Sequence, residues 1–402
     1  MSGTHSPSAI IVSGAGPAGM IAALELARTG RKVTLAGPLS NRDDQRTTAL
    51  MMPSLDCLDA FGIGEKLRAA GAPLKVMRIV DATRRLVRSG PVSFHAAEIG
   101  RDAFGWNFPN LALNAALEHA VAGEPGIRRI EKPVDAWSID ADCVTATIGD
   151  ETVRAQLAVA ADGRKSPARD AAGIKVKWRE WPQAALVLTF SHQRPHGFVS
   201  TEFHTEAGPC VQVPLPGNRS SLVWVNAPAE AQALMALDDG ALALKVEERL
   251  DSILGKVTLE GGRQVWPLAN AVPEYFAARR VALAGETAHV FPPIGAQGLN
   301  LSIRDAIDLI AAIGNSADPG SDDALARYDR LRRPDVHARL AAVSMLNRSL
   351  LSGFLPVQMA RAAGLGLLAR IPPLRALFMR EGMRPGDGFR AIPSALREKV
   401  GR

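Results

Sequence analysis

The fold of this chain is decided near its N-terminus by the stretch Ala9-Ile10-Ile11-Val12-Ser13-Gly14-Ala15-Gly16-Pro17-Ala18-Gly19. A short apolar strand ends just before three glycines in the spacing Gly-x-Gly-x-x-Gly, and residues 20–29 predict a helix. The first glycine permits a tight turn, the second lets the backbone approach a pyrophosphate, and the third lets helix and strand pack closely. With a second apolar strand over 32–36, the stretch predicts a βαβ unit whose helix N-terminus faces the phosphates of an ADP-containing cofactor.

Two later segments carry glycine motifs of a related kind. The first follows an apolar strand over 157–160 and reads Ala161-Asp162-Gly163-Arg164-Lys165-Ser166-Pro167-Ala168-Arg169. The second precedes a helix over 301–313 and reads Gly285-Glu286-Thr287-Ala288-His289-Val290-Phe291-Pro292-Pro293-Ile294-Gly295-Ala296-Gln297-Gly298-Leu299-Asn300. An isolated Asp-Gly pair is typical of a surface turn. Three such segments, in this order and at this spacing, indicate one FAD held end to end with its ring near residue 295.

Around these motifs the apolar pattern changes between helical and strand-like segments. Residues 55–70 and 111–122 predict helices, whereas 184–226 are mostly strand. We therefore expect an α/β fold (mixed α+β), with a Rossmann-like FAD-binding domain of separated segments, an inserted β-sheet substrate domain and a helical C-terminal tail. The expected division is 1–72, 98–175 and 265–340 for the FAD-binding domain, 73–97 and 176–264 for the substrate domain, and 341–402 for the helical C-terminal region.

Composition limits the classes of partner and compartment. The 47 Lys and Arg residues against 41 Asp and Glu give a net charge of +6, which favours solubility or attraction to an anionic membrane face. Aromatic residues make up only 5% and no dense Lys/Arg run is present, so we expect no nucleic-acid partner. Three widely spaced cysteines argue against a disulfide framework or a zinc site and fit a reducing cytoplasm. Residues 1–8 lack the pattern of a signal peptide.

The tail from about 341 combines many leucines with arginines such as Arg348, Arg361 and Arg370. No apolar run in it reaches the roughly 18 to 20 residues that a membrane-spanning helix needs. Two interpretations stay open: helices packed on the cofactor domain, or an arginine-flanked apolar surface that rests on a membrane or a partner protein. We expect a cytoplasmic protein, peripheral at the inner membrane face under the second interpretation.

Taken together, these motifs resemble those of the FAD-dependent aromatic hydroxylases, the flavoprotein monooxygenases of the para-hydroxybenzoate hydroxylase type. Within that family the chain is most similar to the ubiquinone-biosynthesis hydroxylase branch, and the similarity covers nearly the whole chain. Besides the glycine motifs, it is carried by Asp44-Gln45-Arg46-Thr47-Thr48-Ala49-Leu50 and by Glu202-Phe203-His204-Thr205-Glu206-Ala207-Gly208-Pro209 with the following Pro214-Leu215-Pro216 and Ser221-Leu222-Val223-Trp224.

The chain departs from the family pattern in four places. Gly37 stands at the end of the second strand, where an acidic residue for the adenosine ribose is expected. Glu286 replaces an aspartate, and the family's Gly-Gln-Gly appears as Gly-Ala-Gln-Gly over 295–298. No arginine or glutamine is present near 111, where Asn110, Leu111 and Asn114 occur.

The resemblance implies which residues bind the cofactor. The glycines of the first motif would bind the pyrophosphate, Arg46 would lie along the FAD, and Asp162 belongs to a motif for FAD and nicotinamide binding. Glu286 would hold the ribityl chain. The full cofactor-binding set is Gly14, Gly16, Ala18, Gly19, Arg46, Asp162, Gly163, Glu286, Ala296, Gly298, Leu299 and Asn300. We expect Pro293 and Gly295 at the catalytic position, and no metal site.

The placement of Gly298-Leu299-Asn300 also has a physical rationale of its own. These residues open the helix over 301–313, whose N-terminus carries unpaired N–H donors and partial positive charge. Reduced flavin is anionic along its pyrimidine edge, and the helix dipole alone would stabilise it by roughly 0.3–2 kcal/mol. We expect His289 to be structural, Arg304 and Asp305 to anchor this helix, and His204 to be a solvated strand residue.

The family resemblance implies a reaction as well. NAD(P)H would reduce the FAD, O2 would add to give a flavin C4a-hydroperoxide, and one oxygen would pass to a lipophilic aromatic substrate, a polyprenylated phenol of ubiquinone biosynthesis. The protein would shield the reacting oxygen from water and orient the ring. Two alternatives remain: a hydroxylase, epoxidase or reductase for another small aromatic or isoprenoid, and a catalytically weak assembly subunit of a biosynthetic complex.

Overall fold

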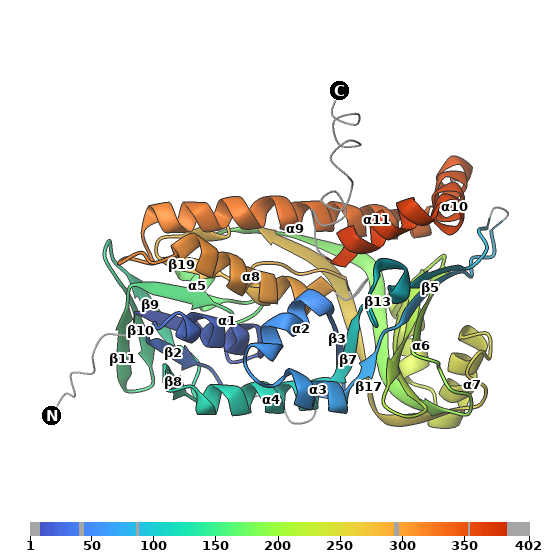
Figure 1. The fold of residues 1–402 in the computed structure, drawn as a ribbon, viewed down its shortest axis with the longest axis horizontal. Coiled ribbons are helices and arrows are strands. Elements are labelled where there is room, and N and C mark those ends of the chain that lie inside the picture. The colour runs from blue at the N-terminus through green and yellow to red at the C-terminus, as the bar shows by residue number, and fades with distance from the viewer. Residues whose placement is uncertain (1–8, 40–43, 86–87, 293–296, 353, 384–402) are drawn as a thin grey trace.

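A computed structural model describes residues 9–39, 44–85, 88–292, 297–352 and 354–383 of the chain (Figure 1). The cofactor domain is built on a six-stranded sheet in the order β18-β19-β12-β1-β2-β8, parallel except for the edge strand β18. Its strands are β1 (Ile10–Ser13), β2 (Val33–Ala36), β8 (Ile127–Ile130), β12 (Leu157–Ala160), β18 (Ala277–Ala278) and β19 (Val281–Leu283). Every residue of β1, β2 and β12 is buried, as is typical of parallel strands covered by helices on both faces.

Helices and two small sheets complete the cofactor domain. Its helices are α1 (Pro17–Arg28), α2 (Met52–Asp59), α3 (Gly64–Ala70), α4 (Asn110–Gly123), α5 (Pro167–Ala171), the 3₁₀ turn η2 (Gly285–Thr287) and α8 (Gln297–Ile313). One small sheet joins β3 (Thr47–Met51), β7 (Gly105–Pro109) and β4 (Ala72–Pro73), and the other joins β11 (Glu151–Ala155), β10 (Val144–Ile148) and β9 (Ala136–Ile139). α1 packs against both α4 and α8.

The second domain is a seven-stranded sheet, here called the substrate sheet, in the order β17-β13-β16-β15-β14-β5-β6. Its strands are β5 (Val76–Asp81), β6 (Val92–His95), β13 (Val176–His192), β14 (Val199–Thr205), β15 (Gly208–Leu215), β16 (Arg219–Asn226) and β17 (Val257–Pro273), and η1 (Ala96–Ile99) follows β6. β5 and β14 run parallel although more than 100 residues separate them.

The two faces of the substrate sheet have different neighbours. α6 (Pro228–Met235) and α7 (Asp239–Arg249) cover one face with a separate apolar core, and Figure 1 shows them on the side away from the cofactor domain. The other face turns toward the cofactor domain. There Ser221 of β16 accepts a hydrogen bond from Thr47 of β3 at 2.8 Å, and Asn107 donates to the Pro214 carbonyl at 2.9 Å. This second face therefore packs on β3 and β7 of the cofactor domain.

The C-terminal region is helical: α9 (Asp322–Leu351), α10 (Leu355–Arg370) and α11 (Pro372–Met383). α9 runs along the cofactor domain, and α10 and α11 reach the edge of the substrate sheet (Figure 1). The predicted fold class is confirmed. Two expected domain boundaries fall inside continuous elements, since β17 crosses residue 265 and α9 crosses residue 341.

Among the described residues, one pair of helices has the length and composition of a membrane-spanning segment. No single helix there is long and apolar enough to cross a bilayer, but α10 and α11, which meet at 105°, have the necessary length and composition as a pair.

Candidate functional site: the cofactor cradle and its buried support

The structure brings the three glycine motifs together at one edge of the cofactor sheet. β1, β12 and β19 are adjacent parallel strands, so their carboxyl ends lie side by side. Gly14 follows the first strand, Asp162 the second and Gly285 the third. In open parallel sheets this edge is where ligands bind. The predicted assembly of the three segments is therefore present in the fold.

Side-chain hydrogen bonds hold the three loops in fixed relative positions. Asp162 accepts from the Ser13 hydroxyl at 3.0 Å and from the Thr287 hydroxyl at 3.3 Å. The Thr287 oxygen in turn accepts from the backbone N–H of Gly163 at 2.9 Å. Because these residues come from β1, the loop after β12 and η2, the Asp162 carboxylate ties all three loops into one unit.

We call the glycine-containing loops after β1, β12 and β19, together with the start of α8, the cofactor cradle. Two kinds of glycine occur in it. Gly14 has φ +100°, and a Cβ there would collide with the Ala161 carbonyl, just as a Cβ at Gly19 would collide with the Gly14 carbonyl. By contrast, a Cβ at Gly16, Gly163 or Gly298 would meet nothing within 4 Å, so these backbones border open space. α1 starts directly after Gly16 with no side-chain cap and no acid in its first turn. Its free N–H donors and an open, glycine-lined surface fit the pyrophosphate of FAD.

A second helix N-terminus borders the same region. α8 begins at Gln297, which places the N–H groups of Gly298 and Leu299 in its first turn, where no intrahelical acceptor exists. The Asn300 side chain is fully used in packing: its oxygen accepts from the Met51 N–H at 2.8 Å and the Ser54 hydroxyl at 2.7 Å, and its amide donates to Ala49. Asn300 therefore fixes α8 against β3 and α2.

Three predicted site residues, Pro293, Gly295 and Ala296, lie outside the described residues. Ala18 is the second residue of α1, inside the helix that opens the cradle, and its methyl group would press on a Cβ placed at Gly285. Ala18 therefore contributes to the close packing between the first and third motifs.

Arg46 is oriented by Asp44 directly and by Asn110 through the same carboxylate. Asp44 binds it in a fork, with Nε and a terminal nitrogen each 2.8 Å from a carboxylate oxygen. Asn110 donates to the same carboxylate at 2.9 Å. Burial raises the pKa of Asp44, but the bonds from Arg46 and Asn110 outweigh burial and hold that pKa below its usual value. Asn110 stands in the region where the family's arginine or glutamine is missing.

Glu286 lies on the surface of η2. Its side chain is 60% exposed and forms a two-pronged ion pair with Arg164, with both N–O distances at 3.2 Å. Its predicted contact with the ribityl chain stays a prediction. The pair links the second and third motif loops a second time, outside the Asp162 contacts.

The end of β2, where the sequence pattern predicts a carboxylate for the adenosine ribose, carries a cation instead. A side chain at Gly37 would collide with the backbone of Ala15, so an acidic residue has no room there. Arg129 of β8 instead donates to the Gly37 carbonyl at 2.6 Å and to the Leu35 carbonyl at 3.2 Å. Burial lowers the pKa of this guanidinium. Arg129 thus caps the carbonyls at the end of β2.

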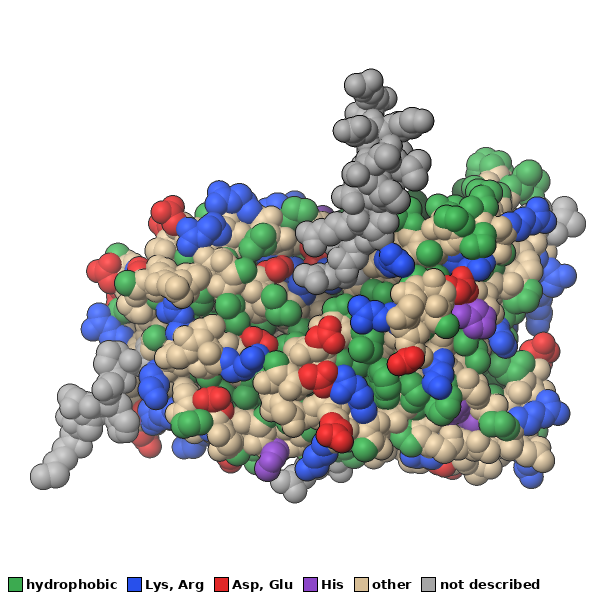
Figure 2. Space-filling model, in the orientation of Figure 1, with side chains coloured by type: hydrophobic (Ala, Val, Ile, Leu, Met, Phe, Trp, Pro, Cys, Tyr) green, Lys and Arg blue, Asp and Glu red, His purple; other side chains and the backbone are tan. Residues whose placement is uncertain are grey.

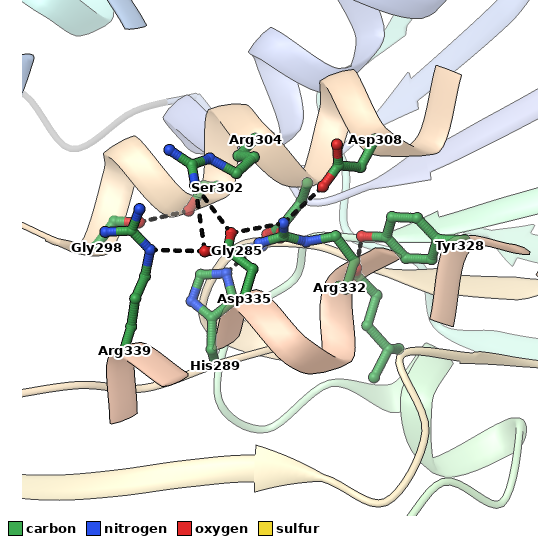
Figure 3. Close-up of polar contacts among 12 residues, drawn as sticks. Gly285, His289, Gly298, Ser302, Arg304, Asp308, Tyr328, Arg332, Asp335 and Arg339 are labelled. Carbon is green, nitrogen blue, oxygen red and sulfur yellow. Dashed lines mark hydrogen bonds and ion pairs between the residues drawn. The ribbon is translucent and has the colours of Figure 1, made fainter. Parts of the chain in front are cut away.

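A fully buried carboxylate, Asp305 of α8, supports the third motif. Figure 3 shows three of its neighbours, Gly285, His289 and Arg332, gathered from different elements. Asp305 accepts the Gly285 N–H at 2.9 Å, His289 Nε2 at 2.8 Å and Arg332 Nε at 2.8 Å. These contacts confirm the prediction that Asp305 anchors its helix. His289 Nδ1 is buried with no hydrogen-bond partner in the described residues, and the structural role of His289 stays a prediction. The η2 turn is therefore bonded directly to the side of α8.

Arg332 of α9 extends this network, although its side chain is completely buried. It also contacts Asp308 at 2.7 Å and Asp335 at 3.0 Å, and Asp335 binds Arg304 at 3.1 Å. Burial raises the pKa of Asp308. Burial also raises that of Asp335, but the nearby arginines outweigh it and hold the pKa below its usual value. The Arg304 contact confirms the expected anchoring role.

One sequence expectation is wrong. His204 of β14 was expected to be a solvated strand residue, but it is only 1% exposed. Its Nε2 lies 2.8 Å from Glu202 Oε1, and its Nδ1 is buried with no hydrogen-bond partner in the described part of the chain. Nothing in the local pattern Thr-Glu-Phe-His-Thr distinguishes this burial from a solvated strand.

A mostly parallel six-stranded sheet with glycine loops at the carboxyl ends of its strands is typical of proteins that bind a dinucleotide. Comparison with known proteins agrees. The chain belongs to the family described as FAD binding domain, which matches residues 7–343. The resemblance to FAD-dependent aromatic hydroxylases is thereby confirmed, and the protein is an FAD-dependent monooxygenase.

Two relatives and one solved structure show the similarity. Ubiquinone hydroxylase UbiL of Rhodospirillum rubrum is 33% identical over 387 residues, covering 93% of this chain and 89% of that protein. The 3-demethoxyubiquinol 3-hydroxylase of Escherichia coli is 28% identical over 380 residues, covering 90% and 95%. A crystal structure of a Klebsiella pneumoniae HpxO variant complexed with FAD superposes with a TM-score of 0.75 at 20% identity, covering 94% of this chain and 99% of that one.

We predict that Arg332→Met lowers the free energy of unfolding by about 3–5 kcal/mol, because it leaves the buried Asp305 carboxylate with one ionic partner fewer. The matched control is Arg164→Met, which removes an exposed ion pair and should change stability by about 1 kcal/mol or less. Urea unfolding of the FAD-free protein, followed by circular dichroism, measures both. Equal effects of the two substitutions would contradict a supporting role for the buried network.

Proposed function

We propose that this FAD-dependent monooxygenase hydroxylates the aromatic ring of a polyprenylated phenol in ubiquinone biosynthesis, with O2 and with NAD(P)H as electron donor. The observation that carries the proposal is the apolar centre of the sheet face that contacts the cofactor domain: Val187, Val211, Val223 and Val225 occupy neighbouring register positions there. The named activities of the two relatives support the substrate class. When bound, FAD supplies the activation of O2 and the transfer of one oxygen atom.

The chain's own residues would position the cofactor in this proposal. Gly14, Gly16 and Gly19, with the first turn of α1, would hold the pyrophosphate. Arg46, fixed by Asp44, would lie along the cofactor. The N–H groups at the start of α8, from Gly298 and Leu299, would face the flavin edge, where the absence of acids in the first turn leaves the helix dipole uncompensated. The second sheet would exclude water from the ring.

A pair of glycine substitutions tests the cradle. Gly16 has ordinary backbone angles and open space before it, so Gly16→Ala should leave the FAD-free protein as stable as the wild type. The added methyl group should weaken FAD binding about tenfold or more, equivalent to about 1.4 kcal/mol. Gly19→Ala should instead destabilise the FAD-free protein, because its Cβ would collide with the Gly14 carbonyl. FAD fluorescence titration and urea unfolding separate the two effects. Wild-type FAD affinity in Gly16→Ala would place the pyrophosphate elsewhere.

The reaction itself is tested with 2-geranylphenol as the probe. We expect the flavin of the purified protein to be reduced by NADPH or NADH faster when the phenol is present, and the product to gain one atom from isotope-labelled O2. Stopped-flow absorbance and mass spectrometry measure these two outcomes. Flavin that is reduced while the phenol stays unlabelled would support a reductase instead. Flavin that neither nicotinamide reduces would point to a protein electron donor.

We also propose that the protein is cytoplasmic and rests on the inner membrane face through its C-terminal helices. Apolar side chains on α10 and α11 are unusually exposed, including Phe354 just before α10 at 66%, Met359 at 55% and Phe378 at 53%. Figure 2 shows hydrophobic side chains gathered over α10. Exposed apolar surface of this kind marks an interaction site for a membrane or a protein.

A basic groove lies beside these helices. It has a volume of about 1280 Å³ and runs between α9 and the β13–β17 pair. Lys177, Arg179 and Arg348 line it, are exposed, and have no ion pair within the described residues, while exposed Trp178 and Tyr275 stand at the same groove. Cations with interfacial aromatic residues suit the anionic headgroup layer of a bilayer.

Charge reversal tests this docking. Because each basic residue near an anionic surface contributes about 1 kcal/mol, the combined Lys177→Glu, Arg179→Glu and Arg348→Glu protein should bind vesicles containing phosphatidylglycerol at least about tenfold more weakly. Sedimentation with phosphatidylcholine vesicles, with and without phosphatidylglycerol, gives the measurement.

The control for net charge reverses three exposed lysines elsewhere, Lys32, Lys66 and Lys256. This control protein carries the same total charge and should bind as the wild type does. An equal loss of vesicle binding in both proteins would show that net charge alone explains the effect. Wild-type protein that does not bind anionic vesicles would overturn the membrane proposal.

A further inference from the structure

A pair formed by partly buried Glu202 and buried His204 stands on the face of the substrate sheet that turns toward the cofactor domain. Phe203 of β14 packs into the core beneath α6 and α7, so its neighbours Glu202 and His204 point to the opposite face. That face also carries Ser221, bonded to Thr47 of the cofactor domain, and Trp266, over which Arg46 stacks at 5.5 Å. The pair therefore belongs to the interdomain side of the sheet.

Contacts place the pair near the N-terminus of α8. The Asn300 side chain binds the Met51 N–H at 2.8 Å, and Met51 packs in one apolar cluster with Ile79 of β5. Ile79 lies directly opposite Glu202 in the strand register. The cluster that Met51 and Ile79 share therefore links the β5–β14 strand pair to the region of the helix end that is proposed to face the flavin edge.

The surroundings of the pair offer it no other polar partner on β15. Across the register, Glu202 faces Val211 and His204 faces Pro209. On β5, His204 faces Asp81, whose oxygens are taken by Arg361 of α10 at 3.0 Å and by Thr83 at 2.7 Å. Asp81 and Arg361 are the charged groups on the elements packed beside His204, and they neutralise each other. Glu202 is therefore the charged group that contacts the His204 ring directly.

The contact with Glu202 fixes the proton on the imidazole ring. An ionised carboxylate only accepts hydrogen bonds, so the ring nitrogen that faces it, Nε2, carries the hydrogen. Nδ1 then holds a lone pair. This atom is buried and unpaired in the described part of the structure, a state that native proteins avoid unless a ligand or water completes it. A histidine backed by a carboxylate, with its second nitrogen free, has the arrangement of a general base.

We propose that His204 Nδ1 accepts the proton of the substrate's phenolic hydroxyl, and that Glu202 is the positioning residue that holds the imidazole for this task. The inference rests on the proposed function and names the polar group that recognises the phenol. The O–H bond of the phenol breaks, an N–H bond forms at Nδ1, and the electron pair stays on the phenolate oxygen. The resulting imidazolium is stabilised by Glu202. The phenolate ring is richer in electrons and attacks the oxygen donor faster, which gives the ketone form of the product. Loss of the proton from the oxygenated ring carbon restores aromaticity, the Nδ1 proton returns to the ketone oxygen, and the ring-carbon proton neutralises the oxygen left on the donor, which departs as water.

The experiment reads the ionisation of a bound phenol without turnover. The oxidised FAD-loaded protein is titrated with 2-geranylphenol at a series of pH values, and ultraviolet absorbance distinguishes phenol from phenolate. In the wild type, the bound phenol should ionise at lower pH than the free one. In His204→Phe this advantage should be lost, and kcat should fall about 10²–10⁴-fold while KM changes little, as expected for loss of a general base.

Two further variants make the result decisive. Glu202→Gln keeps the shape of the pair but removes the negative charge, so the phenol should ionise at a pH between those of wild type and His204→Phe. If His204→Phe fails to fold, this variant carries the test. His192→Phe is the control, since His192 is also buried but both its ring nitrogens are bonded, to the Arg194 carbonyl and to Ser220. It should leave the ionisation of the bound phenol unchanged.

The failures of the two proposals differ. Wild-type protein that hydroxylates the phenol, with His204→Phe and Glu202→Gln showing unchanged ionisation and an unchanged pH profile of kcat, would overturn the role of His204 alone. Wild-type protein that holds FAD but neither binds nor hydroxylates the phenol would overturn the proposed function and this assignment with it.

Discussion

The position of the whole cofactor site depends on one buried charge, the Asp305 carboxylate. It holds the Gly285 N–H directly, and the turn that begins there carries Thr287, which fixes Asp162 and through it Ser13 of β1. Removing a charge pair from water costs several kcal/mol per ion, so such a pair adds little net stability. Its contribution is geometric: three loops separated by more than 100 residues in the sequence keep one relative position. Arg332 extends that order to α9.

Much of this arrangement is readable from the sequence because it is local. The glycine spacing, the apolar strands before each motif and the helix after Asn300 each lie within about 20 residues, so the cradle and the anchoring of Asp305 could be predicted. The main partner of Asp305, which is Arg332, could not be predicted in this way. Arg332 lies in an arginine-rich stretch of α9 that reads as a solvated helix face, yet it is completely buried. Only the packing of α8 on α9 determines which arginine turns inward.

Long-range strand pairing explains the other omissions. His204 is buried because β14 lies between β15 and β5, and β5 comes from a segment more than 100 residues earlier. The alternation of polar residues in β14 predicts one solvated face, which is correct only for an edge strand or an uncovered sheet. The sequence shows that Gly37 departs from the family pattern, but it does not show that Arg129 binds the Gly37 carbonyl. Arg129 comes from β8, which is distant from β2 in sequence and adjacent to it in the sheet.

A lipid-tailed phenol needs an apolar surface for its tail and one polar group that accepts its proton. α10 borders both the exposed apolar surface and the proposed acceptor, His204. Leu365 of this helix packs with Met77 and Ile79 of β5, while Met359 and Leu367 remain exposed. Arg361 binds Asp81, which lies opposite His204. Two of its guanidinium nitrogens are buried without partners in the described structure, so the pair is poor as a source of stability. It is better explained as a device that fixes the register of α10, because the helix proposed to face lipid must also border the proposed phenol site.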